Sequence, residues 1–427
     1  MPRKNFSHSV LHLFAICITS AFISTNAAAG EKIVYSFTGG NDGGDPASAL
    51  IFDQAGNAYG TTAVGGLFGF GTVFKLAPNG NGGWIQSVLY SFQGGNDGKN
   101  PYGGVAMDRD GNLYGTTAAG GTGGVCAGDG CGTVFKLTHD QHDNWTESVL
   151  YNFTGGDDGF GPGSALTYKR GVFYGMTPDG GKYGAGTVFL LLPNATNHWA
   201  LVTIHSFTGG DDGAVGSLGP LLADGAGNLY GVTELGGAFG AGTVFKISPA
   251  GNGQFNLTTL YAFQGQPDAA FPYGGVVFDH DGNLYGTTYY GGTNGVGAVY
   301  KLTATMNGWQ ESVLYSFQGG TDGSFTTTTP IFNFAGDLYG TTSTGGKESC
   351  DCGTVFKLSL VNGIWQESVV YRFQSAPDGA NPYYGLASDS VGNLYGTTAA
   401  GGTQNSGTVF QISAQDSNRL SPTLRRR

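Results

Sequence analysis

The feature of this sequence that most constrains its fold is a unit of about 56 residues that recurs seven times. The segment GNLYGTTAAGGT occurs at residues 111–122 and again at residues 392–403. The tyrosine of this element recurs at intervals of 54 to 60 residues, at Tyr59, Tyr114, Tyr174, Tyr230, Tyr285, Tyr339 and Tyr395. Each copy also has a GTVF-type and a YSF-type element. Repeats of this length predict small units that bury their apolar faces against one another.

Each repeat holds four short apolar runs separated by turn residues. In the first copy these are ALIFD (49–53), NAYGTT (57–62), GTVFKL (71–76) and WIQSVLYSF (84–92). β-Branched and aromatic residues bounded by Gly, Asn, Asp and Pro are typical of strands. No convincing helical period extends over ten residues after the first 29. Seven units of four strands predict an all-β fold, a single seven-bladed β-propeller of four-stranded antiparallel blades.

The ends of the repeat region indicate how the ring closes. KIVYSF (32–37) is a fourth strand with no preceding three, whereas the last copy stops after its third strand, GTVFQI (407–412). We predict that the N-terminal strand completes the last blade, because an open array would leave two unpaired sheet edges. The propeller domain is then expected to span residues 30–413, with a flexible basic tail at 414–427.

The first 29 residues have the character of a secretory signal peptide. Arg3 and Lys4 precede an apolar run from Val10 to Ile23, and three alanines close the segment at position 29. A buried first helix is the alternative, but small residues and a strand pattern follow the run at once. No later stretch has the roughly 18 apolar residues that a membrane span needs. We therefore expect a secreted or periplasmic protein with no membrane span in its mature chain.

The charge of the mature chain restricts its partners. Removal of Arg3 and Lys4 with the leader leaves 17 basic and 30 acidic residues, a net charge of −13. Such a surface repels phosphate backbones and anionic lipid headgroups, which argues against nucleic-acid or membrane-surface binding. The expected partner is a polysaccharide or an envelope component, and a monomer is expected.

An aspartate stands five residues after the phenylalanine of every YSF-type element. Its seven copies are Asp42, Asp97, Asp158, Asp212, Asp268, Asp322 and Asp378. The position predicts an Asx-turn in which the carboxylate caps backbone N–H groups between blades. The alternative is a calcium or polar-ligand loop, but calcium takes six or more oxygens and each loop offers one or two carboxylates. A structural role is favoured and no cofactor is predicted, with calcium as the alternative.

Other recurrent residues also indicate packing. A tryptophan stands eight residues before the YSF-type phenylalanine in five copies, which favours packing between blades over a sugar-stacking platform. The second threonine of YGTT recurs seven times, at Thr62 and its equivalents, and we expect it to form hydrogen bonds between neighbouring blades.

Four cysteines remain after the leader. Cys126 and Cys131 lie in one loop of the second repeat, and Cys350 and Cys352 lie in the equivalent loop of the sixth. Export permits disulfides within each pair, although a bridge between Cys350 and Cys352 would be tight. A four-cysteine zinc site is the alternative, and it would have to join two distant repeats.

Catalytic motifs are hard to find. The five histidines after the leader fall at unrelated repeat positions, and neither G-x-S-x-G nor H-E-x-x-H occurs. No catalytic residue is predicted. An enzyme stays open as an alternative, because a propeller can assemble an active site from single residues on different blades.

A site that binds a single ligand molecule needs residues that differ from those at the same position of the other repeats. After the last threonine of YGTT most repeats have small or apolar residues, but three consecutive repeats depart from this. The departures that we select as a candidate ligand site are Asp179, Glu234, Tyr289 and Tyr290. Two carboxylates and two tyrosines on neighbouring blades suit a sugar, by hydrogen bonding and ring stacking. Drift on a solvated loop is the alternative.

The order of these elements resembles a known family. VLYNFTGGDDG (149–159), GNLYGTTAAGG (111–121) and GTVFKL (132–137) are similar to the GloVer tandem repeat of bacterial choice-of-anchor surface proteins. The resemblance covers essentially the whole mature chain. It implies an exported, β-propeller-like repeat protein and no established activity. Members often end in a hydrophobic sorting signal, whereas this sequence ends in SPTLRRR, so release or periplasmic residence is expected.

Together these features favour an exported, non-catalytic repeat protein, a ligand-binding or scaffold propeller of the bacterial envelope or secretome. The alternative is an extracellular carbohydrate-active enzyme, a lyase or glycoside hydrolase, with its site on the face of the longer loops. A purely structural envelope component is a third possibility.

Overall fold

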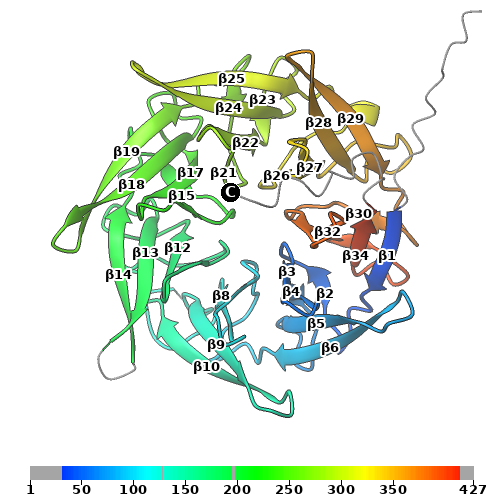
Figure 1. The fold of residues 1–427 in the computed structure, drawn as a ribbon. Coiled ribbons are helices and arrows are strands. Elements are labelled where there is room, and N and C mark those ends of the chain that lie inside the picture. Colours follow the sequence, from blue (N-terminus) through cyan, green and yellow to red (C-terminus); the bar gives the residue numbers. More distant parts are fainter. Residues whose placement is uncertain (1–30, 127, 195–197, 414–427) are drawn as a thin grey trace, which may run out of the picture.

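A computed structural model describes residues 31–126, 128–194 and 198–413. They form a ring of seven four-stranded antiparallel blades around a central axis (Figure 1). The predicted all-β propeller is thus confirmed. The proposed signal peptide (1–29) and the basic tail (414–427) lie outside the described residues.

Within each blade the four strands are arranged in order from the central axis to the outside of the ring (Figure 1). The innermost strands, from blade 1 to blade 7, are β3 (Ile51–Phe52), β7 (Val105–Met107), β11 (Thr167–Lys169), β16 (Leu222–Ala223), β21 (Val277–Phe278), β26 (Ile331–Phe332) and β31 (Ala387–Ser388). The second strands are β4 (Ala58–Val64), β8 (Leu113–Thr117), β12 (Val172–Thr177), β17 (Leu229–Leu235), β22 (Leu284–Thr288), β27 (Leu338–Thr342) and β32 (Leu394–Thr398).

The outer half of each blade has the longer strands. The third strands are β5 (Thr72–Pro78), β9 (Thr133–His139), β13 (Thr187–Pro193), β18 (Thr243–Gly251), β24 (Ala298–Thr305), β28 (Thr354–Val361) and β34 (Thr408–Ile412). The outermost strands are β6 (Trp84–Ser91), β10 (Trp145–Asn152), β14 (Trp199–Ser206), β19 (Gln254–Ala262), β25 (Gly308–Ser316), β29 (Ile364–Arg372) and β1 (Glu31–Ser36).

Short strands lie where the chain enters some blades. β2 (Gly44–Pro46) and β15 (Ala214–Gly216) pair with the ends of β4 and β17. β20 (Ala269–Ala270) pairs with β23 (Tyr290–Gly291), and β30 (Gly379–Ala380) pairs with β33 (Ala400–Gly401). Within the described part of the chain the one helical element is a single 3₁₀ turn, η1 (Gly320–Asp322).

The first described strand lies beside the last one. β1 pairs antiparallel with β34, with Glu31 opposite Ile412 and Ser36 opposite Thr408, and the two are neighbours in Figure 1. This is the pairing that closure by the N-terminal strand requires. That the pairing holds the ring shut stays a prediction, which truncation of β1 tests.

The blades pack through two repeated aromatic contacts. The phenylalanine that ends each YSF-type element packs edge-on against the aromatic residue of the next GTVF-type element, at 4.9 to 5.4 Å between ring centroids in all seven blades. Further along the outermost strands, Trp84 packs against Tyr395 of the preceding blade, and Trp365 packs against Tyr285 in the same way. The prediction that the tryptophans pack between blades is confirmed.

The recurrent threonines correct one expectation. In six blades the second threonine of YGTT bonds the threonine of the GTVF element within its own blade, as in Thr62 and Thr72, with 2.8 to 2.9 Å between hydroxyl oxygens. Bonds to the next blade come from the threonine one position earlier, such as Thr397 to the carbonyl of Ser48 at 3.0 Å. The expectation was wrong because successive side chains of a strand point to opposite faces.

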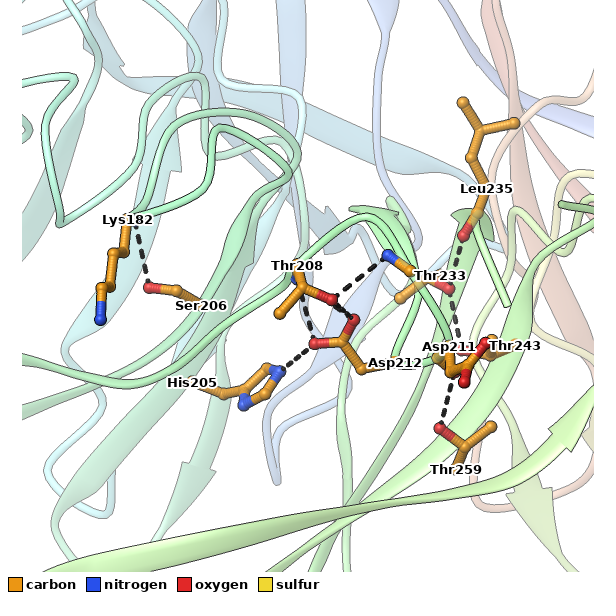
Figure 2. A network of polar contacts seen from close by, with 11 residues as sticks. Lys182, His205, Ser206, Thr208, Asp211, Asp212, Thr233, Leu235, Thr243 and Thr259 are labelled. Carbon is orange, nitrogen blue, oxygen red and sulfur yellow. Dashed lines mark hydrogen bonds and ion pairs between the residues drawn. The ribbon is translucent and has the colours of Figure 1, made fainter. Parts of the chain in front are cut away.

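The seven recurrent aspartates lie in the loops that lead from one blade into the next. Each carboxylate accepts a hydrogen bond from the backbone N–H four residues earlier and from a side chain seven residues earlier, which is a tyrosine in six blades. In the loop from the third blade into the fourth, His205 of β14 takes the place of the tyrosine, and its Nε2 lies 3.0 Å from Oδ2 of Asp212 (Figure 2). The carboxylate therefore holds the entry loop closed. No three His, Cys, Asp or Glu side chains cluster as a metal site in the described ranges.

A second carboxylate motif holds the hairpin between the first two strands in five blades. In blade 1, Asp53 accepts hydrogen bonds from the backbone and side-chain amides of Asn57 and from the hydroxyl of Tyr59. Burial opposes ionisation of Asp53, but these bonds outweigh it, and the pKa of Asp53 lies below its usual value. Asp224 and Asp279 have the same surroundings and the same direction of pKa shift.

The antiparallel order sorts the loops onto two faces. The loops into each blade and the loops between second and third strands share one face, which we call the entry face. Two of the latter loops are closed by disulfides, Cys126–Cys131 and Cys350–Cys352. Over residues 31–126, 128–194 and 198–413, no helix has the length and apolar character to cross a membrane.

Candidate functional site

A cavity of about 410 Å³ lies where the entry loops converge ahead of the innermost strands. All seven blades contribute to its wall, through Ser48, Tyr102, Ala165, Leu218, Tyr273, Thr328 and Tyr383. A larger but shallower hollow of about 610 Å³ lies against β6, and every residue that lines it falls between 41 and 93. The first cavity is the better candidate, because a site built from all the blades is deeper and more specific than a groove on one blade.

Five tyrosines give the cavity its chemical character: Tyr102, Tyr273, Tyr289, Tyr383 and Tyr384. Three of them stand directly after a proline of an entry loop, Tyr384 is the next residue, and Tyr289 follows β22. The prolines fix these loops against the preceding blade. A Cβ added to Gly242, for instance, would lie 2.7 Å from Cδ of Pro272, so this glycine makes room for the proline beside Tyr273.

The tyrosines of blade 5 form part of a packed aromatic cluster. The ring of Tyr289 stacks on Phe325, with centroids 4.9 Å apart and planes at 28°. Tyr273 lies 5.3 Å from Tyr289, and Tyr290 packs edge-on against Phe271 at 5.7 Å. Such contacts fix ring orientation, so this side of the cavity presents a preformed aromatic wall.

Two carboxyl groups act on the lining tyrosines. Burial raises the pKa of Glu234 in β17. Burial, together with the nearby Glu234, raises the pKa of the Tyr273 hydroxyl. Asp45 in β2 acts in the same sense on Tyr102 and Tyr384, whose pKa values are raised by burial and then by its charge. Burial also raises the pKa of Asp45.

The structure brings together part of the site predicted from the sequence. Tyr289 lines the cavity and packs against Tyr273 of the same wall, and Glu234 is near Tyr273 but absent from the wall. Tyr290 is the neighbouring ring of the cluster and is 45% exposed. Asp179 is exposed and absent from the cavity wall, and its carbonyl accepts a hydrogen bond from the N–H of Phe160. A role of these four residues in binding stays a prediction.

Four lining tyrosines and Asp45 escaped the sequence analysis. The residue after the entry-loop proline differs among repeats, as Ala47, Tyr102, Gly163, Tyr273 and Tyr383 show. Glu234 and Tyr289 were selected because they differ from the residues at the same position of the other repeats. The same comparison, applied to the entry loops, would have found the other four lining tyrosines and Asp45.

Four pairs of carboxyl groups lie away from the cavity, in blades 2, 5, 6 and 7. Each joins a glutamate of an outermost strand to the recurrent aspartate of the same blade's entry loop, and we call these the carboxyl pairs: Glu147–Asp97, Glu311–Asp268, Glu367–Asp322 and Glu31–Asp378. In each glutamate, Oε1 is buried with no hydrogen-bond partner among the described residues. Blades 1, 3 and 4 have Gln86, Leu201 and Leu257 at this position.

Burial, followed by the charge of the nearby aspartate, raises the pKa of each glutamate. The pKa rises from 4.5 to about 7 for Glu31 and Glu147 and to about 8 for Glu311 and Glu367. Because none of the four lines the cavity, these shifts concern the packing of the blades.

The Gloeobacter/Verrucomicrobia repeat matches the chain at residues 21–142, 82–278, 123–347 and 219–421. The chain belongs to this repeat family. The resemblance seen in the sequence is thereby confirmed. No protein of curated function matches the chain.

Two solved structures are similar to this member of the repeat family. One is a putative 6-phosphogluconolactonase from Bacteroides uniformis, 12% identical, with 76% of this chain and 84% of that one covered at a TM-score of 0.49. The other is a protein of unknown function from Dyadobacter fermentans, 11% identical, with 90% of this chain and 99% of that one covered at a TM-score of 0.43.

Proposed function

We propose that this repeat protein is exported and acts as a non-catalytic carbohydrate-binding protein of the bacterial envelope or secretome, with its ligand in the tyrosine-lined cavity. The observation that carries the proposal is the set of five tyrosines on one cavity wall. A tyrosine ring packs against the C–H face of a sugar while its hydroxyl bonds the sugar hydroxyls. Hydroxyls of Ser48 and of the threonines at 327–329 supply further polar groups.

The same wall supports binding over catalysis. A glycoside hydrolase places two carboxyl groups on either side of the scissile bond. Here the described wall consists of tyrosine, threonine, serine, glycine, proline and aliphatic residues, and no carboxyl group lines it. A lyase needs a general base, and tyrosine can serve as one. Burial raises the pKa of four lining tyrosines and so opposes the ionisation that a base requires: Tyr102, Tyr273, Tyr289 and Tyr384.

Export has support of its own. Residues 1–29 have the pattern of a cleaved signal peptide, and two disulfides suit an oxidising compartment. The test is expression of the full chain in a bacterial host, followed by fractionation. The mature chain starting at residue 30 is expected in the periplasm or medium, and an uncleaved chain in the cytoplasm would refute export.

Binding is tested with the mature chain on immobilised neutral and acidic polysaccharides, with retention and release of reducing ends measured together. Retention without reducing ends is expected. The variant Tyr273→Ala/Tyr289→Ala should lose retention, because it removes two rings of the wall. Tyr183→Ala is the matched control, since Tyr183 is 55% exposed on the same face and lies outside the cavity. Equal retention by the double variant would refute the proposed site, and release of reducing ends would favour the enzyme.

A further inference from the structure

We propose that the ligand is a chain of sugar units, and that Tyr290 binds the unit that follows the one held in the cavity. The inference rests on the proposed carbohydrate-binding function and adds a second subsite to it. Tyr289 lines the cavity, whereas Tyr290 does not. The ring centroids of these two residues are 4.7 Å apart, with their planes at 80°. A ligand that reaches Tyr289 is therefore one aromatic ring away from Tyr290.

The aromatic surface continues from the cavity wall onto the entry face. Tyr273 and Tyr289 belong to the wall and are half-buried, with centroids 5.3 Å apart. Tyr290 is the next ring, and it is 45% exposed. A tyrosine ring with this exposure offers a surface for the C–H face of a sugar, and its hydroxyl can bond the sugar hydroxyls.

The cavity itself has room for a short ligand. Its volume of about 410 Å³ is near the lower end of the range of about 300 to 1,000 Å³ that small-molecule sites have. A longer glycan has to leave the cavity and continue over the entry face. Beside the wall of blade 5, the ring that it meets there is that of Tyr290.

Two phenylalanines hold the ring of Tyr290 in place. Phe271 packs edge-on against it at 5.7 Å between centroids, and Phe325 does so at 5.6 Å. A side chain that is already held loses little conformational freedom when a ligand binds. Tyr290 is thus a preformed surface, although it is exposed.

Both phenylalanines have a backbone conformation that is unfavourable for bulky side chains. Their φ angles of 55° and 59° lie in the left-handed region. The equivalent residues, all with positive φ, are Asp45, Asn100, Gly161, Val215 and Asn381. Four of these five are of the types that tolerate this region. Strain that is retained at both residues in contact with Tyr290 supports a function for this ring.

The fold does not need an aromatic residue at the position of Tyr290. The other blades have Val64, Ala119, Asp179, Leu235, Thr344 and Ala400 there. In blade 7, Ala400 pairs with Ala380 in the same way as Tyr290 pairs with Ala270 in blade 5. Alanine therefore fits this strand pairing, and Tyr290→Ala removes the ring without removing the pairing.

The test measures dissociation constants as a function of chain length. The probes are glucose, mannose and galactose, and the cello-, malto-, manno- and galacto-oligosaccharides of two to six units, titrated into the mature chain. Within a series that binds, we expect the affinity to rise about tenfold or more from one unit to three, because one further aromatic contact is worth roughly that.

Tyr290→Ala should remove this gain. The dissociation constant of the trisaccharide should rise about tenfold, and that of the single sugar should stay the same, because the cavity wall is unaltered. Tyr290→Phe keeps the ring and should keep most of the gain. Tyr183→Ala is the matched control, since it removes an exposed tyrosine of the same face and should change neither constant.

Phe271→Asn tests whether Tyr290 must be held in place. The equivalent asparagines donate from Nδ2 to a carbonyl of the preceding blade, Asn100 to Ala63 at 3.0 Å and Asn381 to Ser343 at 3.1 Å. The urea midpoint should therefore be kept, because asparagine suits this position and its positive φ. Binding of the trisaccharide should still weaken, and binding of the single sugar should not.

The outcomes separate this inference from the proposed function. The second subsite would be overturned by equal affinity for one unit and three, or by a Tyr290→Ala variant that binds the trisaccharide as before or weakens both ligands equally. In each case loss of retention in Tyr273→Ala/Tyr289→Ala would leave carbohydrate binding at the cavity intact. If no saccharide of any length binds, both proposals fail together.

Discussion

The carboxyl pairs make the stability of this propeller depend on pH in a defined direction. Each glutamate has a folded pKa near 7 or 8, against 4.5 in the unfolded chain. A raised folded pKa means that the folded state holds the proton more tightly. The contribution to stability is therefore fully present below pH 4.5, and it is lost as pH rises through 7 to 8. We expect this loss to disappear when the four glutamates, Glu31, Glu147, Glu311 and Glu367, are replaced by glutamine.

The size of the effect follows from the pKa shifts and the burial of the groups. One pKa unit corresponds to about 1.4 kcal/mol, which sets a ceiling of about 3 to 5 kcal/mol for each glutamate. The side chains are only partly buried, so solvent screening reduces this to about 1 kcal/mol each. The pairs lie in different blades and their effects should add, which gives a loss of about 4 kcal/mol in the free energy of unfolding between pH 5 and pH 9.

The assay is urea-induced unfolding of the mature chain at pH 5 and pH 9. The unaltered protein should lose stability toward pH 9, and the quadruple glutamine variant should lose about 4 kcal/mol less. Glutamine fits this position, since Gln86 of blade 1 donates from Nε2 to the carbonyl of Asp42 at 3.3 Å. The converse change, Gln86→Glu, should add a fifth pair and deepen the loss by about 1 kcal/mol.

Glu348→Gln controls for net charge, because Glu348 is exposed and far from any recurrent aspartate in the sequence. It should leave the pH dependence of unfolding as it is. The same difference between pH 5 and pH 9 in the unaltered chain and in the quadruple variant would refute the reasoning. In that case the glutamates are solvated well enough to ionise without cost.

Three further predictions follow from the packing of the ring. Removal of residues 30–37 should lower the unfolding midpoint sharply and promote self-association, because β34 then has an unpaired edge; an unchanged midpoint in a chain that stays monomeric would refute closure by β1. Asp45→Asn should raise stability at pH 7 by about 1 kcal/mol through a new bond to the carbonyl of Ala399, and a fall in the urea midpoint would contradict this. Gly274→Ala should cost about 2 kcal/mol or more and weaken ligand retention, since its Cβ would lie 2.3 Å from the backbone carbon of Thr328; near-normal stability would show that the inner loops can move apart.

The repeat made most of the fold predictable. Positions that recur seven times had to serve a need common to every blade, and the tryptophans and the entry-loop aspartates do so. The threonines show the limit of that reasoning. Recurrence showed that both threonines of YGTT matter, but whether Thr116 or Thr117 faces the next blade depends on strand orientation, and Thr116 is the one that bonds the carbonyl of Ser164.

The candidate site was predictable only in part. Comparison of repeats found Glu234 and Tyr289, because both break the pattern at a position where other blades have small residues. It also selected Asp179, whose side chain is exposed away from the cavity wall. Whether a loop side chain reaches the cavity depends on the assembled ring, and the pattern of a single repeat does not predict it.

The number of blades, the strand order and the aromatic residues that pack one blade against the next could be predicted from the sequence alone, because they recur in the repeats. Which departures from the repeat meet in space was decided by the folded ring. Tyr102, Tyr273 and Tyr384 come from blades far apart in the chain, and they share one wall because the entry loops converge on the axis. Convergence of distant loops depends on the ring and on close backbone contacts between neighbouring blades, such as that of Gly219 with Gly275, and no single repeat contains them.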